Sequence, residues 1–217
     1  MGKGAWGLVL FLVFFLGTLA SCDEKKPVPK PFCYLRTDFP EHQYSNFQVK
    51  NPMFDYQFDI SNLYALRQNL QSQTPLQFPF IFRRLLMCGD QQFGFQEFDL
   101  GPINGTLLVI QKRFDSKDTL INLINYANDL VYDHKIKADR IDFNQIIAPE
   151  KKVYGTFFTL RGNVATNYQF YLTDSSSRFV RGEILLNCRP NYDSLRPTLD
   201  YLNVDLNRML RTFRWVN

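Results

Sequence analysis

The sequence predicts an α+β domain in which an antiparallel β-sheet is accompanied by two long amphipathic helices. Aromatic residues make up 16% of the chain, with 21 Phe and 11 Tyr, a composition that favours sheets and argues against disorder. A group of strand-like segments lies between two segments with helical periodicity, which is the order expected of an α+β fold with an antiparallel sheet.

The strands are expected from alternation and from turn residues. The first falls within 47–59, where apolar residues alternate around a break at Asn51-Pro52. A buried strand is expected at 105–114. Four more strands are predicted, at 140–148, 153–160, 167–173 and 178–188. The polar turn 174–177 should join the last two strands into a hairpin.

Two helices are predicted from apolar residues that recur at helical spacing. The first should begin at Asp115-Ser116 and carry a stripe that ends on His134, which we interpret as a core or edge histidine. The second should be capped by Asp193 or Ser194, with Pro197 in its first turn. Its apolar face comprises Leu195, Leu199, Leu202, Leu206, Leu210 and Phe213. The pattern leaves open whether the helices share one layer or flank the sheet.

The least regular part of the chain is 60–103, which we expect to be an irregular insertion. Leu63, Leu66 and Leu70 indicate a short helix there. Pro75 and Pro79 then interrupt an apolar stretch that ends at Met87.

Residues 1–21 have the features of a secretory signal peptide. Lys3 precedes an apolar run that is too short for a membrane-spanning helix, and small residues follow it. The sequence Leu19-Ala20-Ser21-Cys22 resembles the lipobox of bacterial lipoproteins, in which the cysteine thiol is acylated. We therefore predict lipidation of Cys22; plain secretion and an uncleaved anchor are the alternatives.

A short tether should link the lipid to the domain. Residues 22–31 contain Cys22 and then three prolines and five charges, a composition typical of an extended spacer. At about 3.1 Å per residue, the nine residues after Cys22 would span roughly 28 Å. The sequence thus divides into a leader (1–21), a lipidated tether (22–31) and a single α+β domain (32–217).

Charge and cysteine content narrow the class of protein further. The formal net charge is +4, and removal of the leader with its one lysine leaves +3, which is too mild to indicate nucleic acid as a partner. If Cys22 carries lipid, Cys33, Cys88 and Cys188 remain, and an odd number cannot all pair within one chain. We expect buried free thiols, and a disulfide in an oxidising compartment is the alternative.

No catalytic or cofactor motif is present in the sequence. Only two histidines occur, His42 and His134, and no His or Cys cluster has the spacing of metal ligands. Nucleophile-elbow, P-loop and dinucleotide-binding patterns are absent as well. We therefore predict no catalytic residues, no metal site and no cofactor.

The chain resembles the gliding-motility lipoprotein GldD family. The similarity begins with Pro29-Lys30-Pro31, Tyr34-Leu35-Arg36, Phe39-Pro40 and Tyr44, and resumes near residue 105. It includes His134, Lys137-Ala138-Asp139, 149–155, Gly162-Asn163, Ala165, Phe170, 173–175, Phe179 and Gly182. The final block comprises 190–194, Pro197, Tyr201, Asp205 and Trp215. Residues 60–103 depart from the family pattern.

This resemblance implies a non-enzymatic envelope lipoprotein that supports gliding motility and the type IX secretion machinery. It also implies attachment to a membrane, with the outer membrane favoured, and other lipoproteins of the same machinery as partners. The order of elements is similar to the PsbP/Mog1-type fold, a likeness that says little of function. We expect the exposed polar residues Lys137, Asp139, Glu150, Lys151 and Lys152 to contact a protein partner.

Two other classes of function remain as alternatives. A membrane-tethered lipoprotein that binds a small molecule or glycan would need an apolar cavity with a few converging polar groups. An envelope hydrolase would need a nucleophile and a base that meet in space.

Overall fold

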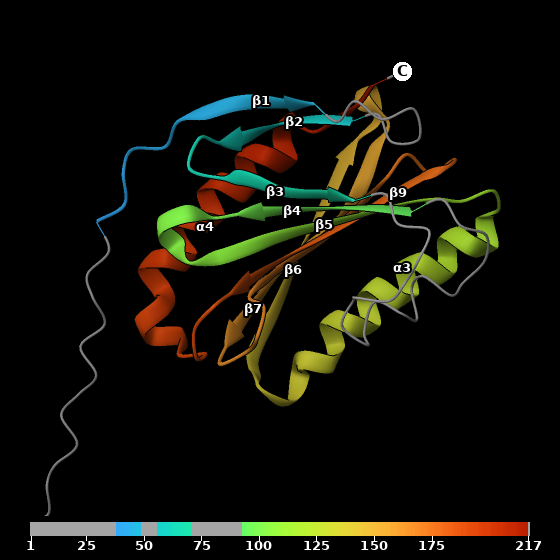
Figure 1. Ribbon diagram of the computed structural model, residues 1–217. Coiled ribbons are helices and arrows are strands. Elements are labelled where there is room, and N and C mark those ends of the chain that lie inside the picture. The colour runs from blue at the N-terminus through green and yellow to red at the C-terminus, as the bar shows by residue number, and fades with distance from the viewer. Residues whose placement is uncertain (1–37, 49–55, 71–92, 217) are drawn as a thin grey trace, which may run out of the picture. The chain divides into compact units, whose positions relative to one another are not determined.

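A seven-stranded antiparallel sheet forms the centre of the fold in the computed structural model, which describes residues 38–48, 56–70 and 93–216 (Figure 1). The strand order is β3-β4-β5-β9-β8-β7-β6. The seven strands are β3 (Ala65–Leu70), β4 (Phe93–Asp99), β5 (Gly105–Arg113), β6 (Ala138–Ala148), β7 (Val153–Gly162), β8 (Tyr168–Thr173) and β9 (Arg178–Leu186). All described residues belong to one compact unit, Thr37–Asn217.

A second, three-stranded sheet joins the two ends of the described chain. Its order is β1 (Tyr44–Gln48), β2 (Tyr56–Ser61) and β10 (Arg214–Trp215), and both pairings are antiparallel. β1 and β2 correspond to the strand predicted within 47–59, and the expected break at Asn51-Pro52 falls outside the described residues.

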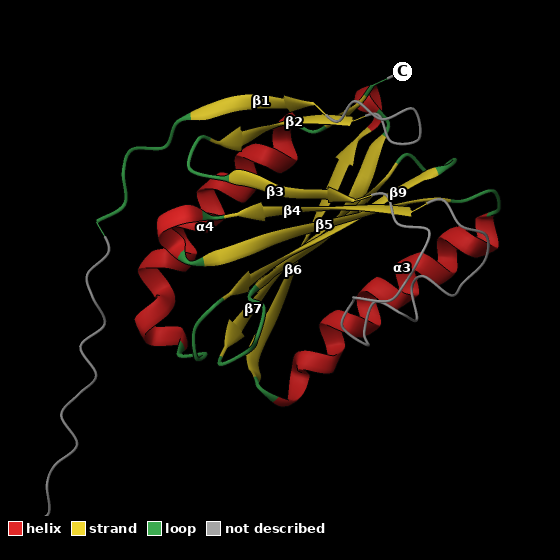
Figure 2. Ribbon diagram, in the orientation of Figure 1, coloured by secondary structure: helices red, strands yellow, loops and turns green. Residues whose placement is uncertain are grey.

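Two long helices accompany the sheets, as the sequence predicts (Figure 2). α3 (Lys117–Tyr132) begins after Ser116, whose side chain accepts a hydrogen bond from the N–H of Thr119. It continues into a 3-10 turn, η2 (Asp133–Ile136), which contains the partly buried His134.

The start of α4 (Tyr192–Thr212) differs from the prediction. The N-cap is Asn191, whose side chain accepts from the N–H of Ser194, so the expectation of a cap at Asp193 or Ser194 was wrong. Consequently Pro197 lies inside the helix beyond the first turn. The earlier start places Asp193 in the first turn, where its negative charge interacts favourably with the helix dipole.

The two helices pack on opposite faces of the large sheet, which settles the question that the sequence left open. α4 contributes Leu199, Leu202 and Leu206 to a large core that also contains Phe58 of β2 and Phe170 of β8. α3 contributes Leu123 and Ala127 to a smaller cluster, and Val131 to a third. Because side chains alternate along a strand, β8 and β9 contribute residues to the apolar clusters on both faces of the sheet.

The part of the chain expected to be an irregular insertion contains regular structure. Ala65–Leu70 is the edge strand β3, so the expectation of a short helix there was wrong. The pairing of β3 with β4 decides this conformation, and a leucine spacing cannot reveal it. Residues 71–92 lie outside the described residues. A 3-10 turn, η1 (Gly101–Ile103), links β4 to β5.

Two glycines inside strands make room for their neighbours, as the sequence indicated. A Cβ at Gly182 would lie 2.2 Å from the Phe170 ring, and one at Gly155 would lie 1.9 Å from the backbone oxygen of Tyr171. Gly182 thus lets the Phe170 ring lie flat on β9 within the α4-side core.

Candidate interaction surface

The charged residues predicted to contact a partner lie at the two ends of one edge strand. Lys137 and Asp139 flank the start of β6, and Glu150 and Lys151 form part of the 3-10 turn η3 (Pro149–Lys151) that follows it. All are exposed. At about 3.3 Å per residue, the eleven residues of β6 separate the two groups by roughly 35 Å. A single copy of the protein therefore does not gather them into one patch.

Lys151 and Lys152 also hold the C-terminal part of the chain. The Lys151 ammonium donates to the backbone carbonyl of Arg211 in the last turn of α4, at 2.8 Å. This contact supplies a donor and a positive charge to the helix C-terminus. Lys152 has a left-handed backbone, with φ of 51°, and its carbonyl accepts from the Trp215 indole N–H at 2.9 Å.

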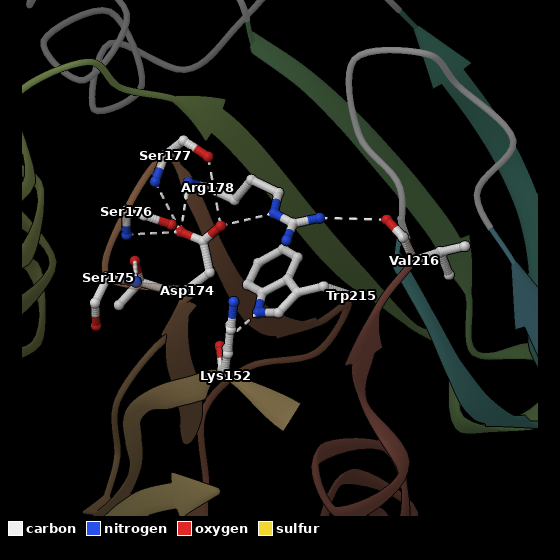
Figure 3. A network of polar contacts seen from close by, with 9 residues as sticks. Lys152, Asp174, Ser175, Ser176, Ser177, Arg178, Trp215 and Val216 are labelled. Carbon is white, nitrogen blue, oxygen red and sulfur yellow. Dashed lines mark hydrogen bonds and ion pairs between the residues drawn. The ribbon is translucent and has the colours of Figure 1, made fainter. Parts of the chain in front are cut away.

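Figure 3 shows how the β8–β9 turn joins this arrangement. One oxygen of Asp174 accepts from the backbone N–H groups of Ser176, Ser177 and Arg178, at 2.8–2.9 Å. Its other oxygen accepts from Arg178 Nε at 2.7 Å. The Arg178 guanidinium lies 4.8 Å from the centre of the Trp215 ring and also donates to the carbonyl of Val216.

The ionisation of Asp174 follows from these contacts. Burial alone would raise the pKa of this carboxyl, but the N–H donors and the Arg178 guanidinium outweigh it and lower the pKa to about 2. The Asp174 carboxyl is therefore ionised at neutral pH, and the turn contacts the C-terminal strand β10 through Arg178. We assign this cluster a structural role, because its polar groups are directed at one another.

The opposite end of β6 is built by close backbone contact. Gly162 ends β7 with φ of 120°, and a Cβ there would lie 2.8 Å from both the carbonyl oxygen of Lys137 and the N–H nitrogen of Asp139. Asn163 follows and accepts from the N–H of Tyr192 at the start of α4, at 2.8 Å. Several positions of the family pattern thus have structural explanations in this region.

A buried polar cluster on α4 was not predicted. The Asp205 carboxylate is 2% exposed and accepts from His42 Nδ1 at 2.7 Å. The hydroxyl groups of Tyr44 and Tyr64 donate to it at 2.9 and 2.7 Å. The His42 ring stacks on Tyr201 with 4.1 Å between centroids. His42 and Asp205 are 163 residues apart, so no local pattern could have paired them.

This cluster attaches the first described residues to α4. Burial raises the pKa of Tyr64 and that of Tyr44. The hydrogen bond to Asp205 and the negative charge of Asp205 raise both pKa values further. Both hydroxyls therefore stay protonated and act as donors.

The edge strand β6 presents a different kind of surface on each of its faces. On the α3 side, Phe143 is 62% exposed and Ile147 is 66% exposed. On the α4 side, two grooves lie along the strand. A groove of about 470 Å³ is lined by apolar residues including Ile146 and Leu210, and one of about 510 Å³ by polar residues including Asp142 and Asn203. We call β6 with these two grooves the β6 edge.

The described ranges contain no cluster of metal ligands and one cysteine, Cys188. Within 38–48, 56–70 and 93–216, no group of three His, Cys, Asp or Glu side chains is placed to hold a metal. Cys188 follows β9 and is exposed, so the expectation of a buried thiol was wrong for this residue. The chain leaves the sheet at Leu186, before the cysteine. Cys22, Cys33 and Cys88 lie outside the described residues.

Comparison with known proteins identifies the family. Residues 24–215 match the model of the family described as gliding motility lipoprotein GldD. The chain belongs to this family. The matched range includes 60–103, where the similarity of individual motifs stops. No curated protein and no solved structure matches the chain, so the likeness to the PsbP/Mog1-type fold stays a prediction.

Membership of the GldD family agrees with the lipoprotein signal in the leader. The family description makes this chain a gliding motility lipoprotein, and a lipoprotein is held in the cell envelope by a lipid anchor. Neither helix in the described part of the chain has the length and hydropathy needed to cross a membrane.

Proposed function

We propose that this GldD-family lipoprotein is a non-enzymatic component that supports gliding motility and the type IX secretion machinery through protein–protein contacts. Acylated Cys22 would hold the domain at the outer membrane, and the tether 22–31 would set its reach. Lipoproteins of the same machinery would be its partners, and Lys137, Asp139, Glu150, Lys151 and Lys152 would contact them.

The β6 edge is the observation that carries this proposal. Its strand has a hydrogen-bonded neighbour on one side only among the described strands, and it carries exposed Phe143 and Ile147. Exposed apolar residues on a sheet edge are typical of surfaces that bind another protein. Charged residues at both ends of the strand would add specificity and would speed association.

A clean deletion strain tests the proposal most directly. Deletion should abolish colony spreading and reduce the secretion of type IX cargo, and the wild-type gene should restore both. Normal spreading together with normal secretion in the deletion strain would contradict the proposal. Membrane fractionation of the wild-type strain should recover the protein with outer-membrane markers.

Anchoring and surface charge can then be tested separately. Cys22→Ala should fail to restore spreading, because a soluble domain loses its position at the membrane. Glu150→Lys should weaken complementation, whereas Asp129→Lys on the exposed side of α3 should not; both positions carry exposed carboxylates. Equal complementation by the two charge variants would remove Glu150 from the proposed contact.

The apolar groove of the β6 edge favours a second candidate function. Its volume of about 470 Å³ falls in the range of small-molecule sites, and Lys151 and Asn207 add polar groups to its apolar lining. A lipoprotein that binds a small molecule or glycan would retain this ligand through gentle purification. Native mass spectrometry of the detergent-extracted protein should then show an added mass that Leu210→Arg removes.

A further inference from the structure

The second half of β6 lacks the features that protect sheet edges from pairing. Phe143–Ala148 contains no charge and no proline, and it combines β-branched and aromatic residues. The first half differs, because it has a register shift between Ala138 and Arg140 and an ion pair of 2.5 Å between Arg140 and Asp142. Charges and irregular register are the usual means by which proteins block edge pairing. Among the described strands β6 pairs only with β7, so its uncharged half is open to another strand.

We propose that this strand is β6 of a second copy of the same chain, paired antiparallel with Gln145 opposite Gln145. A two-fold axis perpendicular to the sheet then relates the copies, and both α3 helices lie on the same side. In this register Phe143 of each copy lies opposite Ile147 of the other. The two exposed apolar side chains of each copy cover those of its partner.

The charged residues support the same register. Counting outward from Gln145, the turn η3 of one copy reaches the start of β6 of the other, so that Glu150 comes near Arg140 and Lys151 near Asp139. Each of these pairs joins opposite charges. An antiparallel partner thus brings together the charged residues that a single copy holds at the two ends of β6. Because each charge then meets one of opposite sign, a second copy is favoured over an unrelated protein.

Neighbouring two-fold registers are less favourable. With Asn144 on the axis, Phe143 would face Gln145, and Lys137 would approach Lys151 of the other copy. With Phe143 on the axis, Ile147 would lie opposite the Asp139 carboxylate. Like charges, or a charge opposite an aliphatic side chain, destabilise a cross-strand pair. The Gln145-centred register avoids both.

Attachment to a membrane would assist this pairing. Lipid anchors confine the copies to one surface, which raises their effective concentration, so that a contact of one strand and a few side chains is sufficient. This inference narrows the proposed function at the same surface, because it makes a second copy of the chain the protein that meets the β6 edge, whereas the deletion strain tests the role in motility. Cross-linking therefore tests it independently of the deletion phenotype.

Cysteine cross-linking of the full-length lipoprotein in cell envelopes tests the register. Cys33, Cys88 and Cys188 are changed to serine, Cys22 is kept, and single cysteines are placed at positions 141 and 143–147. On oxidation, Gln145→Cys should give a dimer on a non-reducing gel, because residues on the axis lie about 5 Å apart between Cα atoms. Ile141→Cys should give none, because eight residues along the strand separate its two copies by roughly 27 Å.

A second set of variants tests the apolar contact. Adding Phe143→Glu and Ile147→Glu to Gln145→Cys should abolish the dimer. Adding Ile121→Glu, which changes an exposed isoleucine on α3, should leave it intact. Resistance to limited proteolysis shows that each variant is folded. A cross-linking maximum at position 143 or 144 would overturn the register. Absence of a dimer at every position, or cross-links only to another protein, would overturn the pairing itself.

Discussion

The two faces of the seven-stranded sheet are covered in different ways. On the α4 side, one continuous apolar core joins α4, the large sheet and β2, and its buried carboxylate Asp205 accepts from His42, Tyr44 and Tyr64. The α3 side has two smaller apolar clusters and a buried ion pair, Arg181 with Glu183. We infer that the α4 side contributes most of the stability, while the α3 side depends on satisfying buried charge.

Matched leucine substitutions test this difference and should have the largest effects. Leu202→Ala on the α4 side should lower the free energy of unfolding by about 4 kcal/mol, because the surrounding core is enclosed and cannot collapse. Leu123→Ala on the α3 side should cost about 3 kcal/mol, since its cluster is smaller. Urea unfolding followed by circular dichroism measures both. An equal or larger loss at Leu123 would contradict the comparison.

The buried ion pair on the α3 side should also be sensitive to single changes. Arg181 donates to Glu183 at 2.8 Å and to Gln169 at 2.6 Å, and both charged side chains are at least 90% buried. Arg181→Met should cost about 3 kcal/mol, because the Glu183 carboxylate stays buried without its counter-charge.

A double variant separates charge from packing at the same place. Arg181→Met combined with Glu183→Leu should recover most of the stability lost by the single change, since no unpaired charge remains. Urea unfolding of both variants gives the coupling between the two sites. If the double variant is less stable than Arg181→Met, the pair contributes through packing and the comparison needs revision.

Acid should weaken the β8–β9 turn, which contacts the C-terminal residues Trp215 and Val216 through Arg178. The folded pKa of Asp174 is about 2, below its ordinary value of 3.8, so the ionised form stabilises the fold. This contribution, about 2 kcal/mol, is complete above pH 4 and is lost as the pH falls through 2. Wild type should exceed Asp174→Asn by that amount at pH 6, and the difference should shrink toward pH 2. A difference that is independent of pH would contradict the assignment.

The smallest expected effect concerns the end of α4. Lys151→Met removes the ammonium that donates to the Arg211 carbonyl and should cost about 0.5 kcal/mol. Lys152→Met should be neutral, because Lys152 binds Trp215 through its backbone carbonyl. Thermal unfolding of the two variants, side by side, distinguishes the contacts. Equal melting temperatures would show that the Lys151 contact adds nothing to the α4 side.

Periodicity in the sequence predicted the elements that contain their own signals. The stripe that starts after Ser116, the turn 174–177 and the leucine face of the last helix all correspond to observed structure. The strand Ala65–Leu70 was missed because a leucine spacing is compatible with a helix as well, and only pairing with β4 decides between them. The cap at Asn191 was missed because Asp193 and Ser194 are equally good capping residues.

The candidate surface could be predicted only in part. The strand predicted at 140–148 separates the charged positions near Lys137 from those near Lys152, but the sequence could not show that this strand lies at the edge of the sheet. Exposure of Phe143 and Ile147 was also hidden, because an alternating strand looks the same at the edge of a sheet as in its middle. The partners of Asp205 come from segments more than 140 residues away.

By itself, the sequence determined the class of the domain, its lipoprotein signal and its resemblance to the GldD family. These properties depend on local spacing, composition and motif order, which the chain carries directly. Only the tertiary structure decided which strand lies at the edge, which face each helix covers and where the buried carboxylates find their donors. The physical reason is that strand order and buried hydrogen bonds are settled by packing between segments distant in sequence, and local residue patterns do not record such packing.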